Sequence, residues 1–502
     1  MSSRILGLML CAGLAAGVSG CRKKPDATPQ TVTPSGESPP LDEATPDEAP
    51  VPARPFALGE DFAASAEVTG RLPALPDLEP RLVDGPWTTL RGDDARSGLR
   101  DAPAVEHPRI LWRVQVGIGG YPNTIVEGDE LIWVSTQGEK HDEADPKDGV
   151  VALRKSTGEI AWRYPTESDA NGMTIAAGVL YVVTDGGVLH AVDTATGRAR
   201  WTQELRCAAY TAPVVLGDYV LLQRGDQIER YYASNGNPEF PQDNCRSSER
   251  AGISVDGTTI VSSSATGSER LFEGTERVWT GSLPEASGGR TGAWQPPILL
   301  SSVVLEFVNS WPFPRDAVDY AGRPLFNYRA ALITRWRDSG EIAWVYDVNG
   351  VDENASSRAS GSYFQSLPLV VDGRAYVPSL LRPEITVVDL QRGERLGAIA
   401  LPDCRIRQFS SPVGTRTRGY LARHDGVLYQ FDYESARVTW ALSLGKASLS
   451  GATSSHDPLA DAGCSASPVD GTALFATPTI GTDGTIYVHS GEGWVYAIGE
   501  AQ

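Results

Sequence analysis

The hydrophobic and polar positions of this chain follow a pattern of short strands separated by turns, which is clearest between Val188 and Trp201. In residues 188–192 neighbouring side chains alternate between two faces, as expected for a β-strand. Asp193 can bond its own backbone and Gly197 can adopt a positive φ, so the two predict a turn. A second strand then carries Trp201, and the stretch as a whole predicts a β-hairpin.

The spacing of glycine and aromatic residue recurs along the chain. The same interval of four residues separates Gly158–Trp162, Gly197–Trp201, Gly236–Phe240 and Gly340–Trp344. The aromatic positions Trp162, Trp201, Phe240 and Trp279 are each 39 residues apart, and Trp344, Gly397 and Trp440 follow with gaps of 65, 53 and 43. A period near forty with about four short strands in each repeat is typical of a β-propeller blade. Seven blades can be counted in this way.

The eighth blade is predicted to combine the two ends of the chain. The last repeat has strands at residues 486–489 and 494–498, but its aromatic position would fall beyond Gln502. Residues 110–114 can supply the missing outer strand, which would close the ring and remove an exposed edge. The sequence therefore predicts an all-β, eight-bladed propeller. Its expected docking residues between blades are Trp112, Trp162, Trp201, Phe240, Trp279, Trp344 and Trp440.

The hairpin residues carry a family resemblance. Ala191, Asp193, Gly197 and Trp201 match the Ala-x-Asp-x3-Gly-x3-Trp repeat of the pyrroloquinoline-quinone-like (PQQ-like) propellers. The resemblance extends from about Trp87 to the C-terminus, and residues 91–98 look like the family's lead-in. This family includes eight-bladed quinoprotein alcohol dehydrogenases and the propeller lipoprotein of the outer-membrane barrel assembly machinery. The motif implies the fold strongly and the function only weakly.

The N-terminal segment predicts export and lipid attachment. Residues 1–21 have a basic start, a short apolar stretch and a lipobox-like Val18-Ser19-Gly20-Cys21, which makes Cys21 the expected lipidated residue. An ordinary secretory signal with a chance cysteine is the alternative. Residues 22–80 form a Pro-rich acidic linker with nine prolines between Pro25 and Pro55, and the propeller occupies residues 81–502. Because residue 22 is not aspartate, we expect a lipid-anchored protein at the bacterial outer membrane, facing the periplasm.

Four further cysteines suggest disulfides in an exported protein: Cys207, Cys245, Cys404 and Cys464. Cys207 and Cys245 both follow an outer strand by a few residues, so they fall on neighbouring loops, and Cys404 and Cys464 have the same relation. We therefore expect the pairs Cys207–Cys245 and Cys404–Cys464. Two other connectivities, or four free thiols, remain open.

Two insertions are candidates for function. The acidic residues of 139–148 could bind calcium, or they could form a solvated turn. The longer connection of the fifth blade carries Trp311, Phe313 and Tyr320, which form either a patch for a protein partner or the packing of a longer hairpin on its own blade. The net charge of −19 argues against nucleic acid and anionic membranes as partners.

Signals for catalysis are missing from the sequence. The chain has neither the adjacent cysteines of the quinoprotein dehydrogenases nor a Cys-x-x-Cys-His haem motif, and its six histidines show no metal-ligand spacing. We therefore predict no catalytic residues, no metal and no cofactor. The expected function is that of a monomeric, membrane-anchored binding or scaffolding propeller with an envelope protein as partner. A quinoprotein-dehydrogenase-like enzyme and a small-molecule-binding sensor are the alternatives.

Overall fold

The computed structural model describes residues 78 and 80–501, except 120–124, 141–142, 206–207, 225–226, 241–251, 264–267, 283–289, 294, 312–328, 348–365, 379–383, 403–409, 424–425 and 445–475. The chain divides into two units, residues 1–61 and 62–502, and all described residues belong to the second. The predicted signal segment and nearly all of the predicted linker therefore lie outside the described residues. Every regular element that is described is a β-strand.

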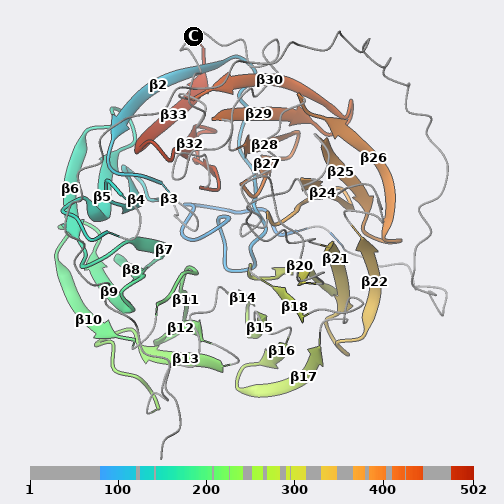
Figure 1. Ribbon diagram of the computed structural model, residues 1–502, viewed down its shortest axis with the longest axis horizontal. Helices are drawn as coiled ribbons and strands as arrows, with labels where there is room; N and C mark the ends of the chain where they lie inside the picture. Colours follow the sequence, from blue (N-terminus) through green and yellow to red (C-terminus); the bar gives the residue numbers. More distant parts are fainter. Residues whose placement is uncertain are drawn as a thin grey trace, which may run out of the picture. The chain divides into compact units, whose positions relative to one another are not determined.

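The strands form eight sheets that follow one another around a ring, and we number these blades in chain order (Figure 1). This confirms the predicted eight-bladed propeller. Blade 1 contains β3 (Ile125–Glu127), β4 (Leu131–Gln137), β5 (Asp148–Arg154) and β6 (Ile160–Pro165). Blade 2 contains β7 (Ala170–Ala176), β8 (Val179–Thr184), β9 (Val188–Asp193) and β10 (Ala199–Glu204). Blade 3 contains β11 (Val214–Leu216), β12 (Tyr219–Arg224) and β13 (Gln227–Tyr232). Blade 4 contains β14 (Gly252–Asp256), β15 (Thr259–Ser263), β16 (Ser268–Glu273) and β17 (Glu276–Ser282).

The second half of the ring is built in the same way. Blade 5 contains β18 (Arg290–Ala293), β19 (Ile298–Leu299), β20 (Val303–Trp311), β21 (Arg329–Trp336) and β22 (Ile342–Asp347). Blade 6 contains β23 (Leu369–Val371), β24 (Arg374–Pro378), β25 (Glu384–Asp389) and β26 (Glu394–Ala400). Blade 7 contains β27 (Val413–Thr415), β28 (Arg418–Arg423), β29 (Val427–Asp432) and β30 (Arg437–Ser443), with β1 (Leu99–Arg100) added in parallel to β27. Blade 8 contains β31 (Thr479–Ile480), β32 (Ile486–His489), β33 (Trp494–Glu500) and β2 (Pro108–Gln115).

Burial follows the position of a strand within its blade. All six residues of β8 are buried, whereas the outer strand β10 alternates between exposed and half-buried residues. This difference arises because the inner strands pack against both neighbouring blades, while the outer strand has one face toward solvent. Eight hydrophobic clusters fill the eight seams between blades, so the core is a ring of blade-to-blade contacts.

The hairpin at residues 188–201 and the closure of the ring are both confirmed. In the hairpin, Asp193 accepts a bond from the backbone N–H of Thr196 at 3.0 Å, and Gly197 has a φ of 67°. At the closure, β2 pairs with β33 and places Trp112 opposite Ala497. The last blade is therefore built from both ends of the propeller segment.

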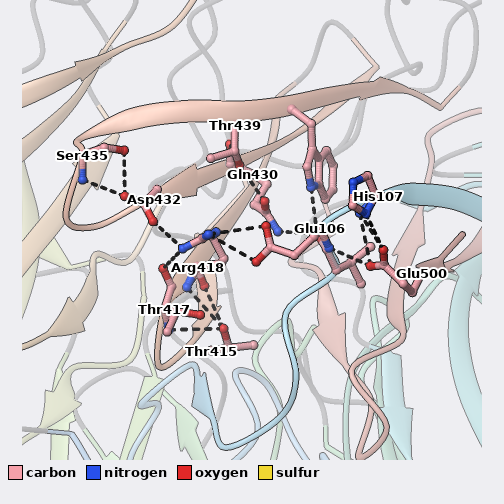
Figure 2. A network of polar contacts seen from close by, with 12 residues as sticks. Glu106, His107, Thr415, Thr417, Arg418, Gln430, Asp432, Ser435, Thr439 and Glu500 are labelled. Atoms are coloured by element: carbon pink, nitrogen blue, oxygen red, sulfur yellow. Dashed lines mark hydrogen bonds and ion pairs between the residues drawn. The ribbon is translucent and has the colours of Figure 1, made fainter.

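A polar network holds the start of β2 against blades 7 and 8 (Figure 2). The Glu500 carboxylate accepts bonds from the backbone N–H groups of Glu106 and His107 at 2.7 and 3.0 Å. Arg418 forms ion pairs with Glu106 and Asp432. These contacts join segments that lie more than three hundred residues apart in the sequence, and they fix the N-terminal strand in its place.

Candidate functional site

Five tryptophans dock between blades with one shared geometry. Each ring lies against the positive-φ glycine in the outer hairpin of the following blade, where an added Cβ would come within 2.5–2.6 Å of the ring. Each indole N–H donates to the backbone carbonyl three residues before that glycine, at 2.7–3.2 Å. A β-bulge immediately before each tryptophan turns the ring into the seam. The pairs are Trp112 with Gly158, Trp162 with Gly197, Trp201 with Gly236, Trp279 with Gly340, and Trp344 with Gly393.

The closing seam reproduces this geometry without a hairpin. Trp440 donates its indole N–H to the carbonyl of Val105 at 2.8 Å, and Gln430 donates to the same carbonyl at 2.7 Å. Val105 belongs to the chain that leads into β2, so it stands where the other blades have a turn. The segment just before the closing strand β2 thus supplies the carbonyl that accepts the bond from the docking tryptophan.

Two seams lack a docking tryptophan. Phe240 was expected to dock from its spacing, but its side chain is 68% exposed, and a phenylalanine has no N–H for the turn carbonyl. Consistent with this, the space above Gly274 in the next blade is open to 4 Å. The spacing alone therefore gave the wrong role for Phe240. In blade 6 the docking position is Gly397, and the turn of blade 7 has Ala436 with a φ of 51°.

Residues 87–100 form an axial segment that crosses the centre of the ring (Figure 1). Its backbone carbonyls accept bonds from N–H groups of blades 1, 2, 4, 5 and 7, at 2.7–3.0 Å. Its arginines reach the remaining neighbours: Arg91 donates to Pro368 before blade 6, and Arg100 donates to Ile480 of blade 8. The segment therefore bonds directly to seven of the eight blades. The sequence identified it only as a lead-in to the propeller.

Arg91 and Arg96 are buried, and both bond to this segment and to the blades around it, while the Nε of Arg96 has no partner among the described residues. The guanidinium of Arg91 donates to four backbone carbonyls, those of Arg96, Ser97, Pro368 and Pro412, at 2.7–3.1 Å. Arg96 donates to the hydroxyl of Thr89 and to the carbonyls of Leu90 and Ile253. Desolvation lowers the pKa of Arg91 to about 9. Both guanidinium groups thus hold the axial segment to the neighbouring blades through hydrogen bonds.

The carboxylate of Glu127 joins the axial segment to blades 1 and 8. It is fully buried and accepts a bond from Arg100 at 2.9 Å and one from the backbone N–H of Thr482, also at 2.9 Å. Lys155 forms a second ion pair with it, and the backbone N–H of Trp87 lies 3.4 Å away. Two cations and two backbone donors therefore converge on one buried anion.

A second group of buried charges lies between blades 4 and 5. Glu306 is 1% exposed, and neither of its carboxyl oxygens has a hydrogen-bond partner among the described residues. Desolvation and the neighbouring charge of Glu269 raise the pKa of Glu306 well above its usual range, while Arg335, which pairs with Glu269, opposes the shift. Burial and the charge of Glu269 thus favour the protonated form of the Glu306 carboxyl group.

The acidic connection between β4 and β5 uses its carboxylates to hold its own turn. Asp148 accepts a bond from the N–H of Asp145 at 2.9 Å, and Asp145 accepts one from Lys147 at 2.7 Å. Desolvation, with Asp169 and Asp145 nearby, raises the pKa of Asp148 to about 6. Across the described part of the chain, no three His, Cys, Asp or Glu side chains gather into a metal site. The described carboxylates of this connection thus bond within the turn, while His141 and Asp142 lie outside the described residues, so the calcium site and the solvated turn both remain predictions.

Several predicted site residues lie outside the described residues: Cys21, Cys207, Cys245, Cys404, Cys464, Phe313 and Tyr320. Trp311 is the last residue of β20, and its side chain is not described. The lipid attachment, the disulfide pairs and the aromatic patch therefore stay predictions. No described element is a helix that could cross a membrane.

The axial segment also bears on the quinone alternative. An anionic quinone cofactor needs cationic or amide donors that are free to meet its carboxylates. The three buried arginines of the axial segment do not fit this need, because Arg91 and Arg96 bond to the chain itself and Arg100 bonds to Glu127 and to backbone carbonyls.

Comparisons with known proteins agree with the repeat pattern. The profile of a family described as outer membrane protein assembly factor BamB matches residues 146–275. BamB from Yersinia pestis is 30% identical over 153 residues, which make up 29% of this chain and 34% of that protein. The match thus spans about a third of the length of this relative.

Two solved structures share the fold over most of the chain. BamB from Moraxella catarrhalis superposes with a TM-score of 0.52 at 15% identity, covering 78% of this chain and 99% of that one. Quinohemoprotein alcohol dehydrogenase from Comamonas testosteroni gives 0.57 at 14% identity, covering 83% and 81%. The protein is an eight-bladed β-propeller that resembles the PQQ-like propellers. Over residues 146–275 it also resembles BamB in sequence.

Proposed function

We propose that this protein is a non-catalytic scaffold of the bacterial outer membrane that is anchored by a lipid on Cys21 and binds an envelope protein. The match of residues 146–275 to the BamB family carries the proposal, because it concerns sequence as well as fold. The axial segment also supports the proposal. Its buried arginines Arg91 and Arg96 already donate to backbone carbonyls of the chain, whereas an anionic ligand would need free donors.

The topology indicates which end of the ring carries the long connections that could contact a partner. The connections β4–β5, β20–β21, β22–β23, β26–β27 and β30–β31 are long, and each follows the second or the fourth strand along the antiparallel path of its sheet, whereas the long β13–β14 connection follows the third strand of blade 3. In an antiparallel blade the second and fourth strands end at the same side, which we name the loop face. The axial segment lies toward the opposite side, because it bonds to Glu127 and Val255 near the ends of first strands. The loop face, with Trp311, Phe313 and Tyr320 on the β20–β21 connection, is the proposed partner site.

Two variants test the proposal in the native host. Cys21→Ala should release the full chain from membranes into the soluble fraction at high salt, with an unchanged circular dichroism spectrum. In the lipidated protein, Trp311→Ala with Phe313→Ala should abolish crosslinking to the partner that co-purifies from the membrane. Phe240→Ala, which removes an exposed aromatic from the side of blade 3, is the matched control. Salt-resistant membrane retention of Cys21→Ala would refute the anchor, and equal crosslinking by all three proteins would refute the proposed partner site.

A further inference from the structure

The outer strands of blades 7, 8 and 1 are basic although the whole chain is acidic, and β2 of blade 8 carries the most positive charge of the three, because β30 of blade 7 and β6 of blade 1 have one arginine each. β2 carries Arg109 and Arg113, β6 carries Arg163, and neither strand has an acidic residue, although the whole chain has a net charge of −19. The outer strands β17 and β26 of blades 4 and 6 each balance one arginine against one glutamate. The two strands β2 and β6 are the outer strands of neighbouring blades and follow one another around the outer edge of the ring (Figure 1). We call this surface the basic wall.

The arginines of the basic wall are available to a partner. Arg109 is exposed and makes no hydrogen bond or ion pair in the described part of the chain. Arg113 is exposed and lies over the ring of Trp494, with 4.9 Å from its guanidinium carbon to the ring centroid. Arg163 donates one N–H to the carbonyl of Val116 at 3.1 Å and has no ion pair. The carboxylates beside the start of β2 already have partners, since Glu106 pairs with Arg418 and Glu500 with His107. Glu159, in the turn before β6, is exposed, and Glu492 adjoins the end of β2, where its backbone carbonyl accepts a bond from Gln115.

Aliphatic side chains stand between these arginines. Ile110, Leu111 and Ile160 are 39%, 43% and 43% exposed, and Val278 on β17 and Leu396 on β26 are exposed to a similar extent, so the basic wall differs from those strands in its charge balance. Leu111 is the bulged residue before Trp112, so the bulge that docks the tryptophan also turns Leu111 outward. Arginines around exposed aliphatic side chains suit a phospholipid surface, where phosphates accept the guanidinium bonds and the acyl region receives the apolar groups.

We propose that the basic wall contacts an anionic phospholipid surface and turns blades 8 and 1 toward the membrane. This inference rests on the proposed function, because the lipid on Cys21 would bring the propeller to that surface. The net charge of the whole chain predicts repulsion, but at physiological salt the Debye length is about 8 Å. The acidic residues of distant blades are therefore screened, and the local arginines decide the interaction at this side of the ring.

Vesicle flotation of the full chain carrying Cys21→Ala tests the proposal without lipid attachment and without any protein partner. Vesicles of phosphatidylglycerol and phosphatidylethanolamine should bind the protein, pure phosphatidylcholine vesicles should not, and high salt should reverse the binding. Each arginine at an anionic surface contributes about a fivefold change in partition. Arg109→Glu with Arg113→Glu should thus weaken binding at least about 25-fold, and Leu111→Ser should also weaken it at physiological salt.

Charge reversal elsewhere on the ring supplies the control. Arg277→Glu on β17 and Arg395→Glu on β26 change the net charge by the same amount as the wall variant but lie on other blades. They should leave vesicle binding within about twofold of the parent protein. Equal binding to neutral and anionic vesicles, or equal losses in both sets of variants, would overturn the proposal. If the protein instead fails to bind vesicles but crosslinks to an acidic protein through the arginines of the basic wall, the partner of the basic wall is a protein and not a lipid, and the proposal is overturned. Because the vesicles contain no protein, failure of the partner site at the loop face would leave this result unaffected.

Discussion

Replacing Glu127 by glutamine should destabilise the propeller more than any exposed substitution in the same blade. The change keeps the size of the side chain but removes the carboxylate that forms ion pairs with both Arg100 and Lys155. The side chain of Arg100 is 2% exposed and that of Lys155 is 14% exposed, so water cannot solvate either cation well. The new amide would also point an N–H2 group toward donors. Breaking a buried ion pair by removing one partner costs about 3–5 kcal/mol.

The expected effect on thermal unfolding is modest because the propeller is large. At about 2.1 cal/mol/K of unfolding entropy per residue, a propeller of about 400 residues would lose about 4–6 °C in melting temperature. Differential scanning calorimetry of the two variants Glu127→Gln and Glu159→Gln measures this loss. Glu159 is exposed in the same blade and has no side-chain partner among the described residues, so its variant should change stability by at most about 0.5 kcal/mol. If both variants melt together, Glu127 does not join the axial segment to the blades.

Three further predictions follow from the described side chains. Gly236→Ala should destabilise the fold more than Gly217→Ala in chemical denaturation, because both glycines have a positive φ but only the Cβ at Gly236 meets the ring of Trp201, at 2.5 Å. Glu306→Gln should flatten the pH dependence of stability. The raised pKa means that folded Glu306 holds a proton that the unfolded chain releases, so its contribution is present at acidic pH and is lost as the pH rises above the unfolded value of about 4.3. The variant should therefore gain on the parent between pH 5 and 8, and a parallel pH profile would contradict the assignment. Purified protein given pyrroloquinoline quinone and calcium should show neither tight binding in calorimetry nor dye-linked alcohol oxidation, and saturable binding with alcohol-dependent dye reduction would favour an enzyme.

The sequence predicted the parts of the fold that repeat at short range. The hairpin at residues 188–201, the number of blades and the pairing of β2 with β33 all depend on spacing within a repeat or on the exposed edge of an incomplete one. The axial segment could not be predicted in this way, because Arg91 bonds to a carbonyl 321 residues away and nothing in its own neighbourhood indicates the partner. Glu306 did leave a signal, since it is the one charged residue in the apolar stretch 303–308. A lone carboxyl group in such a strand indicates burial, but the sequence does not show that Glu269 and Arg335 accompany it.

The docking geometry explains why the glycine and the tryptophan of the repeat vary together from blade to blade. In the sequence they read as one motif, Gly-x3-Trp, but the glycine of each hairpin makes room for the tryptophan of the blade before it. Where a blade has no docking tryptophan, no indole ring of that blade lies against the next hairpin, and the hairpin no longer needs a glycine to make room for it. Blade 6 has Gly397 in place of the aromatic residue, and the next hairpin has Ala436 at a positive φ with no ring above it.

The same seam shows how the lost ring is replaced. Tyr376, Phe431 and Tyr433 pack together between blades 6 and 7, with ring centroids 5.0–5.8 Å apart. Two glycines on blade 7 provide the space, because a Cβ at Gly414 would lie 2.1 Å from the hydroxyl of Tyr433 and one at Gly419 would lie 2.1 Å from the ring of Phe431. In this seam the aromatic rings therefore lie on β24 and at the end of β29 instead of on an outer strand, and the glycines that make room for them lie on β27 and β28. Gly414 and Gly419 therefore make room for rings of their own blade, whereas the glycine of each docking hairpin makes room for the tryptophan of the preceding blade.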